Sequence, residues 1–175
     1  MQLMQRLSSG LVFLALTACN APVHSEQRTV TSSATPTSAH FSLTMSRSGC
    51  FGRCPSYEVA IQENGTVQFT GVRDVAKLGV STGQVDAPAY ARLRNMLASQ
   101  AMSSLAERYT PDSAKCRFAA TDQPTVRLKI TQNQLEQRIE HYLGCEDVPA
   151  LLEQLESAID AAARTDRWIT GREIQ

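Results

Sequence analysis

The segment from Tyr57 to Gly71 alternates apolar and polar residues on both sides of an Asn-Gly pair. Such alternation predicts two β-strands with one buried face, joined as a hairpin. Residues directly opposite each other in a hairpin share a face, and a two-residue Asn-Gly turn would set the two apolar sets on opposite faces. A three-residue loop, Glu63–Gly65, instead sets Ile61 opposite Val67 and supplies the glycine that this loop type needs at its last position. We therefore predict the three-residue loop.

The rest of the chain supplies strands and helices for one layered domain. Apolar residues at every second position predict strands, and apolar stripes at helical spacing predict helices. Beside the hairpin, the predicted elements are strands at 41–46, 75–84, 125–130 and 135–142, helices that begin after Asp86 and Asp147, and a short helical turn near Leu105. Short connections favour antiparallel pairing, and two amphipathic helices need an apolar face to cover. The sequence therefore predicts an α+β fold, an antiparallel sheet of about five or six strands with two main helices packed on one face.

Residues 1–18 have the features of a secretory leader. Arg6 precedes an apolar run from Leu11 to Leu16, and small residues follow directly before Cys19. The run is shorter than the roughly 20 residues that a transmembrane helix needs. The residues Leu-Thr-Ala-Cys at 16–19 resemble the bacterial lipobox. This resemblance implies that residues 1–18 are a removed signal peptide and that Cys19 carries diacylglyceryl and N-acyl chains such as palmitate.

The predicted anchor bears on location and on domain organisation. Two or more acyl chains hold a protein stably at a membrane, so the membrane is an expected partner. Asn20 rather than Asp follows the cysteine, which in lipoproteins of Gram-negative bacteria implies the periplasmic face of the outer membrane. Residues 19–40 are rich in Ser, Thr, Ala and Pro and predict a disordered tether. We expect a single domain over residues 41–165 and a C-terminal tail over residues 166–175.

The charge of the chain excludes one class of partner. It has 17 basic and 17 acidic residues, so loss of Arg6 with the leader leaves a formal charge of 16 − 17 = −1. A nearly neutral chain without a basic run has no electrostatic footprint for nucleic acid. The sequence also lacks a His-Glu-x-x-His motif and a glycine-rich phosphate loop. We therefore predict no nucleic-acid partner and assign no catalytic residue, cofactor or metal ligand.

Four cysteines remain once Cys19 is assigned to lipid, namely Cys50, Cys54, Cys116 and Cys145. An even number in an exported domain predicts two disulfides, with three possible connectivities. The entropy of loop closure differs too little among the pairings to decide between them. Topology favours Cys50 with Cys54, which share one tight loop, and Cys116 with Cys145, which flank the open end of the second hairpin.

The stretch CFGRCPSY, Cys50–Tyr57, carries a resemblance to a known family. Together with the Asn-Gly hairpin and Thr121–Pro124, it is similar to a family of bacterial envelope proteins catalogued as a domain of unknown function, with the hallmark Cys-Phe-Gly-x-Cys-Pro-x-Tyr. The resemblance covers about residues 41–163, and the hallmark is specific because most of its positions are fixed. It implies a small α+β domain without an established activity. It also implies that Cys50 and Cys54 are partners and that Cys116 and Cys145 are a local addition.

These features favour a lipid-anchored, disulfide-stabilised envelope module that binds an unidentified protein or ligand without catalysis. The alternative is a thiol-redox or copper-handling protein that uses Cys50 and Cys54, because Cys-x-x-x-Cys-Pro also occurs in copper-delivery proteins with a thioredoxin-like fold. Thiolates select Cu(I), and His141 is the histidine inside the domain that would complete such a site. A thioredoxin-like site, however, places its cysteines at the start of a helix, whereas these lie between two predicted strands. We interpret His141 as a half-buried strand residue.

Overall fold

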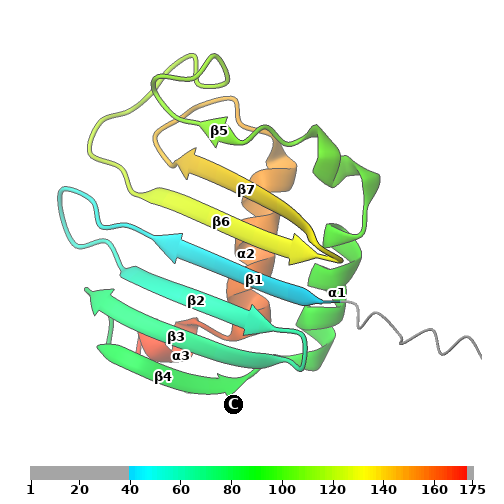
Figure 1. The fold of residues 1–175 in the computed structure, drawn as a ribbon. Coiled ribbons are helices and arrows are strands. Elements are labelled where there is room, and N and C mark those ends of the chain that lie inside the picture. Colours follow the sequence, from blue (N-terminus) through cyan, green and yellow to red (C-terminus); the bar gives the residue numbers. More distant parts are fainter. Residues whose placement is uncertain (1–39, 173–175) are drawn as a thin grey trace, which may run out of the picture. The chain divides into compact units, whose positions relative to one another are not determined.

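Seven strands form a single sheet in the computed structural model, which describes residues 40–172 (Figure 1). The strands are β1 (Phe41–Arg47), β2 (Ser56–Gln62), β3 (Thr66–Arg73), β4 (Gly79–Gln84), β5 (Arg108–Tyr109), β6 (Thr125–Gln132) and β7 (Leu135–Tyr142). Their order across the sheet is β4-β3-β2-β1-β6-β7-β5, and the pairs are antiparallel except that β5 is parallel to β7. The α+β class is as predicted. The expected count of five or six strands is wrong, because β5 is only 2 residues long and has no alternation to recognise.

The hairpin of β2 and β3 has the predicted three-residue loop. Ile61 is opposite Val67, so the apolar residues of both strands face the same side. Gly65 has a φ of +79°, in the left-handed region, and its N–H donates to the carbonyl oxygen of Gln62 at 2.9 Å. A residue with a β-carbon would be strained at that φ, so Gly65 fixes the loop length and thereby the register of the sheet.

Among the described residues, α1 (Ala87–Leu97) and the 3-10 helix η1 (Gln100–Ser104) lie between β4 and β5 in sequence, and α2 (Ala150–Ala163) and α3 (Asp166–Ile169) follow β7. The carboxylate of Asp86 accepts a 2.9 Å hydrogen bond from the N–H of Ala89, so the predicted cap of α1 is confirmed. The predicted cap of α2 is wrong. Asp147 has a φ of +64° and pairs with Arg117, and Pro149 occupies the position before the first helical residue.

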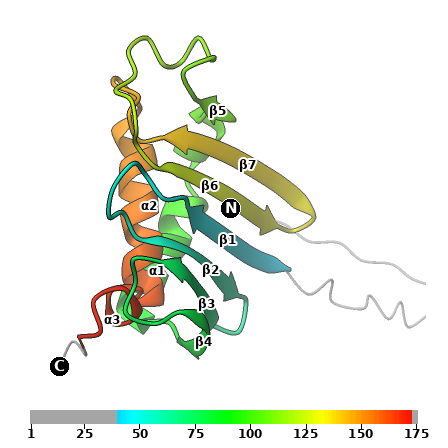
Figure 2. The same ribbon diagram turned by 90° about the vertical axis from the view of Figure 1, so that its left-hand side faces the viewer.

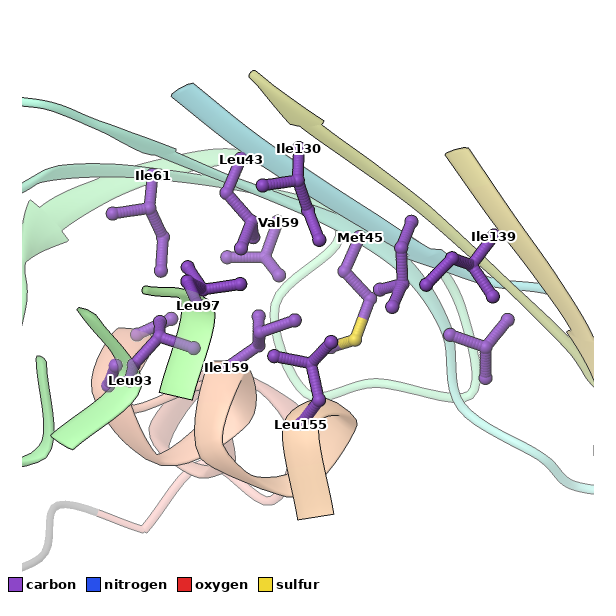
Figure 3. Close-up of a cluster of buried hydrophobic side chains, with 14 of the residues drawn as sticks. Leu43, Met45, Val59, Ile61, Leu93, Leu97, Ile130, Ile139, Leu155 and Ile159 are labelled. Carbon is purple, nitrogen blue, oxygen red and sulfur yellow. The ribbon is translucent and has the colours of Figure 1, made fainter. Parts of the chain in front are cut away.

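Helices α1 and α2 cover one face of the sheet and leave the other face open (Figure 2). The core lies between these two layers, where side chains from the strands meet side chains from both helices (Figure 3). Each buried side chain of this size contributes about 1.5–3 kcal/mol by its removal from water. The labelled core residues are all at most 4% exposed: Leu43, Met45, Val59, Ile61, Leu93, Leu97, Ile130, Ile139, Leu155 and Ile159.

The expected tail over residues 166–175 begins with a helix that packs on the domain, although residues 173–175 lie outside the described residues. Arg164 adopts a left-handed conformation at the end of α2, and α3 follows at once. Trp168 of α3 is 8% exposed and stacks on Phe69 of β3 at a ring distance of 5.0 Å. A four-residue helix is too short for a hydrophobic pattern to reveal, and its position depends on this tertiary contact.

Candidate binding surface at the disulfide end of the sheet

Both disulfides lie at one end of the sheet, where β1 and β7 end and β2 and β6 begin (Figure 1). Cys50 and Cys54 close the loop between β1 and β2, with their α-carbons 5.6 Å apart. Cys116 and Cys145 join the loop before β6 to the segment after β7, with their α-carbons 5.2 Å apart. These are the pairings that the hairpin topology favoured. We call the loops 48–55, 110–124 and 143–147 the disulfide end.

Backbone hydrogen bonds join the three loops of the disulfide end into one surface. The N–H of Phe51 donates to the carbonyl oxygen of Asp122 at 3.3 Å, which links the first loop to the second. The N–H of Glu146 donates to the carbonyl oxygen of Phe118 at 3.1 Å, which links the third loop to the second. Each loop is therefore held both by a disulfide and by a neighbouring loop, and the conformational freedom of all three is reduced.

Two phenylalanine side chains are exposed on this surface. Phe51 lies inside the Cys50–Cys54 loop and is 90% exposed, and Phe118 lies two residues after Cys116 and is 65% exposed. Scattered apolar residues are common on protein surfaces, but these two rings stand on adjoining loops that are fixed by disulfides. Aromatic residues, phenylalanine among them, are enriched in protein interfaces relative to the rest of the protein surface.

The charges around the two rings are of both signs and are mostly paired. Asp74 lies 3.1 Å from Nε of Arg73 and 4.0 Å from Nε of Arg53. On the second loop, Arg117 pairs with Asp147. Exposed pairs of this kind contribute only about 0–1 kcal/mol to stability, so they are available for exchange with charges of a partner.

A partly buried polar network lies where β1 and β2 meet the Cys50–Cys54 loop. The hydroxyl group of Tyr57 donates to Oδ1 of Asp160 at 2.7 Å and accepts a hydrogen bond from Nε–H of Arg47 at 3.0 Å. Arg47 also donates to Oδ2 of Asp160 at 2.9 Å, and the Thr165 hydroxyl group donates to Oδ1 of the same carboxylate at 2.8 Å. The network connects the ends of β1 and β2 to helix α2 and holds the base of the loop against the helix.

The network changes the ionisation of two of its members. Burial, followed by the carboxylate of Asp160, raises the pKa of the Tyr57 hydroxyl group well above its ordinary range. Burial alone would lower the pKa of Arg47, but the neighbouring Asp160, Tyr57 and Glu156 outweigh it and the pKa is raised. Tyr57 therefore stays neutral and Arg47 stays charged, which is the arrangement that satisfies both donors and the carboxylate.

His141 belongs to the same covered face of the sheet. Its Nδ1 lies 2.7 Å from Oε1 of Glu156 on α2, and Glu156 also pairs with Nη1 of Arg47 at 3.5 Å. His141 is 2% exposed, so the expectation of a half-buried residue underestimates its burial. Among residues 40–172, no three His, Cys, Asp or Glu side chains are grouped so that they could hold a metal ion. The residue proposed as the third copper ligand is instead paired with a carboxylate.

Sequence reasoning missed most of this network, although it left a signal. Arg47 continues the every-second-residue series of Phe41 to Met45 that faces the helices, and Glu156 lies within the apolar stripe of α2. Charged residues at such inward positions need a partner, because an unpaired buried charge is strongly destabilising. The parity of Arg47 and the helical position of Glu156 could together have indicated an internal ion pair.

Residues 79–83 have the spacing Gly-x-Ser-x-Gly, which marks the nucleophile of α/β-hydrolases. In that family the serine stands on a sharp turn between a strand and a helix. Here the five residues lie along β4, and Ser81 is opposite Phe69 in the β3–β4 pair. The buried His141 is on β7, on the far side of β1 in the sheet. The motif therefore lacks the geometry of a nucleophile elbow.

A shallow cavity of about 370 Å³ lies on the open face of the sheet, lined by β1, β6, β7 and the segment before β5. Most of its charged groups are paired, with one another or with neighbouring residues. Arg127 pairs with Glu140 at 2.7 Å, and Lys129 pairs with Glu136 at 3.1 Å. A ligand would have to break these pairs, so this cavity is a weaker candidate than the disulfide end.

Comparison with known proteins gives a family but no activity. Within the part of the chain that the structure describes, no helix has the length and apolar character to cross a membrane. No curated protein matches the chain. One family matches residues 41–163, a range that begins with β1, contains both disulfides and ends with α2. The chain therefore belongs to the family DUF6438, a domain of unknown function.

Proposed function

We propose that this chain is a lipid-anchored envelope protein whose disulfide end binds a partner protein without catalysis. The observation that carries the proposal is the exposure of Phe51 and Phe118 on adjoining loops, of which the first is closed by a disulfide and the second is tied by a disulfide to the segment after β7. Exposed aromatic rings at fixed positions fit an apolar recess on another protein. The paired charges around them supply the polar rim that such interfaces have.

The fixed loops favour binding because they lose little conformational entropy when a partner binds. Immobilising a flexible side chain or loop residue at an interface costs about 0.5–1.5 kcal/mol. At the disulfide end the loop between Cys50 and Cys54 is already held by its disulfide, by the hydrogen bond from Phe51 to Asp122 and by the network around Tyr57. Most of the loop's conformational entropy is therefore lost when the domain folds and not when the partner binds.

The proposed anchor is compatible with this surface. A lipid on Cys19 and a tether over residues 19–40 lie outside the described residues except for His40, and β1 begins at Phe41 at the end of the sheet opposite to the disulfide end (Figure 1). The tether would thus join the domain away from Phe51. A tether of this length spans roughly 25 Å if it is flexible, which leaves the disulfide end accessible in the periplasm.

The proposal can be tested by affinity purification of the full chain from the envelope. Replacement of both rings, Phe51→Ser with Phe118→Ser, should reduce recovery of the bound partner at least tenfold. Leu135→Ser is the matched control, because Leu135 is 78% exposed and lies at the opposite end of β7. Recovery of the same partner by the double variant, or equal loss of the partner by the control, would contradict the proposal.

A thiol-redox or copper-handling role for Cys50 and Cys54 remains the second candidate, and one observation favours it. Nη2 of Arg73 donates to the carbonyl oxygen of Cys50 at 3.3 Å, and Arg53 lies within the same loop. Nearby cations stabilise a thiolate and so increase the reactivity of a cysteine. In this case the pair must pass through a reduced form in the cell, whereas a structural disulfide stays oxidised. Alkylation of the envelope before any reduction, followed by mass spectrometry, separates the two roles.

A further inference from the structure

Strand β4 forms a free edge of the sheet (Figure 1). It pairs with β3 on one side, and no strand among residues 40–172 pairs with its other side. The outer side of an edge strand presents unpaired N–H and C=O groups, which can pair with a strand of another chain.

The sequence of β4 lacks the features that usually protect such an edge. Native edge strands are commonly very short, carry charged residues or proline, or are covered by another element. β4 has 6 residues, GVSTGQ, without a charge or a proline. The other edge is protected, because β5 has only 2 residues and Pro111 follows it closely. Arg108, the first residue of β5, pairs with Asp112 at 2.8 Å.

Exposed apolar side chains lie beside the free edge on the open face of the sheet. Val80 is opposite Thr70, and both point away from the covered face to which Phe69 belongs. Val72 at the end of β3 and Leu78 just before β4 have the same parity as these residues. The three apolar side chains are 63–68% exposed: Val72, Leu78 and Val80.

We propose that β4 pairs with β4 of a second copy of this chain, antiparallel and with the two-fold axis at Val80. Residues directly opposite each other share a face, so the open faces of the two copies coincide only if the numbers of opposed residues have an even sum. The proposed register meets this condition, because it sets Val80 against Val80 and Leu78 against Thr82. It joins the exposed apolar side chains of both copies on the open face. The sheet continues from one copy to the other, with the helices of both copies on the same side.

A second copy fits this edge better than an open-ended assembly of copies. An uncharged strand meets itself without repulsion, and an isologous contact of this kind closes after two copies. At the other edge of the sheet β5 has only 2 residues, so pairing of β4 with β5 is disfavoured. The antiparallel arrangement also leaves both disulfide ends uncovered, so the dimer is independent of the binding role proposed above.

Cysteine cross-linking in the envelope tests the register with the full chain. Val80→Cys should give a disulfide-linked dimer on a non-reducing gel after mild oxidation, because the two-fold axis places the new thiols side by side. Leu135→Cys is the control, since Leu135 is similarly exposed and distant from β4 in the sheet. No dimer from Val80→Cys, or equal dimer yields from both variants, would overturn the proposal.

A charge at the same position provides a second test that needs no cross-link. In detergent-purified full chain, light scattering should give the protein mass of two chains for the wild type and of one chain for Val80→Lys, because the two ammonium groups would face each other. Leu135→Lys should remain dimeric. A dimer that survives Val80→Lys overturns the proposal. A monomeric wild type also overturns the proposal. If hydrogen exchange then shows that the β4 amides are protected in the monomer, another segment of the same chain covers this edge.

Discussion

The hydroxyl group of Tyr57 donates a 2.7 Å hydrogen bond to the carboxylate of Asp160, 103 residues later in the chain. Tyr57 is the last residue of the Cys50–Tyr57 motif, and Asp160 lies in the last turn of α2. The contact thus joins the loop that carries Phe51 to the helix layer. It also shows why a tyrosine is needed there, since Tyr57 fills the core with its ring and pairs with Arg47 and Asp160 through its hydroxyl group.

Replacement of Tyr57 by phenylalanine should lower the free energy of unfolding by about 2 kcal/mol, because the partly buried carboxylate of Asp160 loses one of its donors. Urea unfolding monitored by circular dichroism measures the change. Tyr142→Phe is the control, since the Tyr142 hydroxyl group accepts one exposed hydrogen bond from Gln123 and its loss should cost less than about 1 kcal/mol. Equal stability of wild type and Tyr57→Phe would show that the network contributes nothing.

The same hydroxyl group predicts a pH dependence. The pKa of Tyr57 in the folded protein is raised above the ordinary value of 10.0, so above pH 10 the unfolded chain loses the proton while the folded chain keeps it. The stabilising contribution is therefore fully present below pH 10 and is lost as the pH rises further, by up to about 1.4 kcal/mol for each pH unit. Urea unfolding between pH 9 and 11 should show a steeper fall for wild type than for Tyr57→Phe. Parallel curves would contradict the burial of this hydroxyl group.

Helix α3 should be required for stability although it lies beyond the family match. Trp168→Ala removes the ring that stacks on Phe69 and should cost about 3 kcal/mol, measured as a lower midpoint of thermal unfolding. Phe118→Ala, at an exposed position, should leave the midpoint within about 2 °C of the wild type. If the two variants melt alike, Trp168 is not part of the core.

The lipid anchor is tested by labelling. Cells that make the full chain and are fed an alkyne analogue of palmitate should label the wild-type protein, and Cys19→Ser should abolish the label because the proposed acceptor is lost. The variant Cys116→Ser is a control for loss of a cysteine elsewhere and should keep the label. Labelling of the Cys19→Ser protein would refute the hypothesis that Cys19 carries the lipid.

The two disulfides can be tested by alkylation of free thiols followed by mass spectrometry. Blocking the exported chain with an alkylating reagent before reduction should add no mass to the domain, because Cys50 is joined to Cys54 and Cys116 to Cys145. The same treatment after reduction should label these four cysteines. Labelling of Cys50 and Cys54 before reduction, or copper that co-purifies with the chain, would favour the redox or copper role over the structural one.

Local chemistry made part of the fold predictable from the sequence. The parity of Ile61 and Val67 around Gly65 defined the hairpin register, because only one loop length puts both residues on the buried face. Asp86 defined the start of α1 because a side-chain cap is a local interaction. The cysteine pairs followed from the same topology, since a hairpin brings its open ends together.

The rest depends on contacts between residues that are distant in sequence. β5 exists because the N–H of Glu140 donates to the carbonyl oxygen of Glu107 at 2.8 Å, which no local pattern encodes. α3 is held where Trp168 meets Phe69, and the ionic network needs Arg47 and Asp160 to meet across two layers. The exposure of Phe51 and Phe118 could not be predicted either, because a loop phenylalanine can turn inward or outward with the same sequence.

The most direct test of the account places a photo-crosslinking amino acid at position 51 of the full chain in living cells. Phe51 is 90% exposed at the disulfide end, so a bound partner should contact the replaced side chain. Illumination should give one discrete adduct with an envelope protein, and the adduct should be lost when Phe118→Ser is added and absent when the crosslinker is placed at Leu135 instead. Absence of an adduct at position 51, or the same adduct from position 135, would contradict a binding role for the disulfide end.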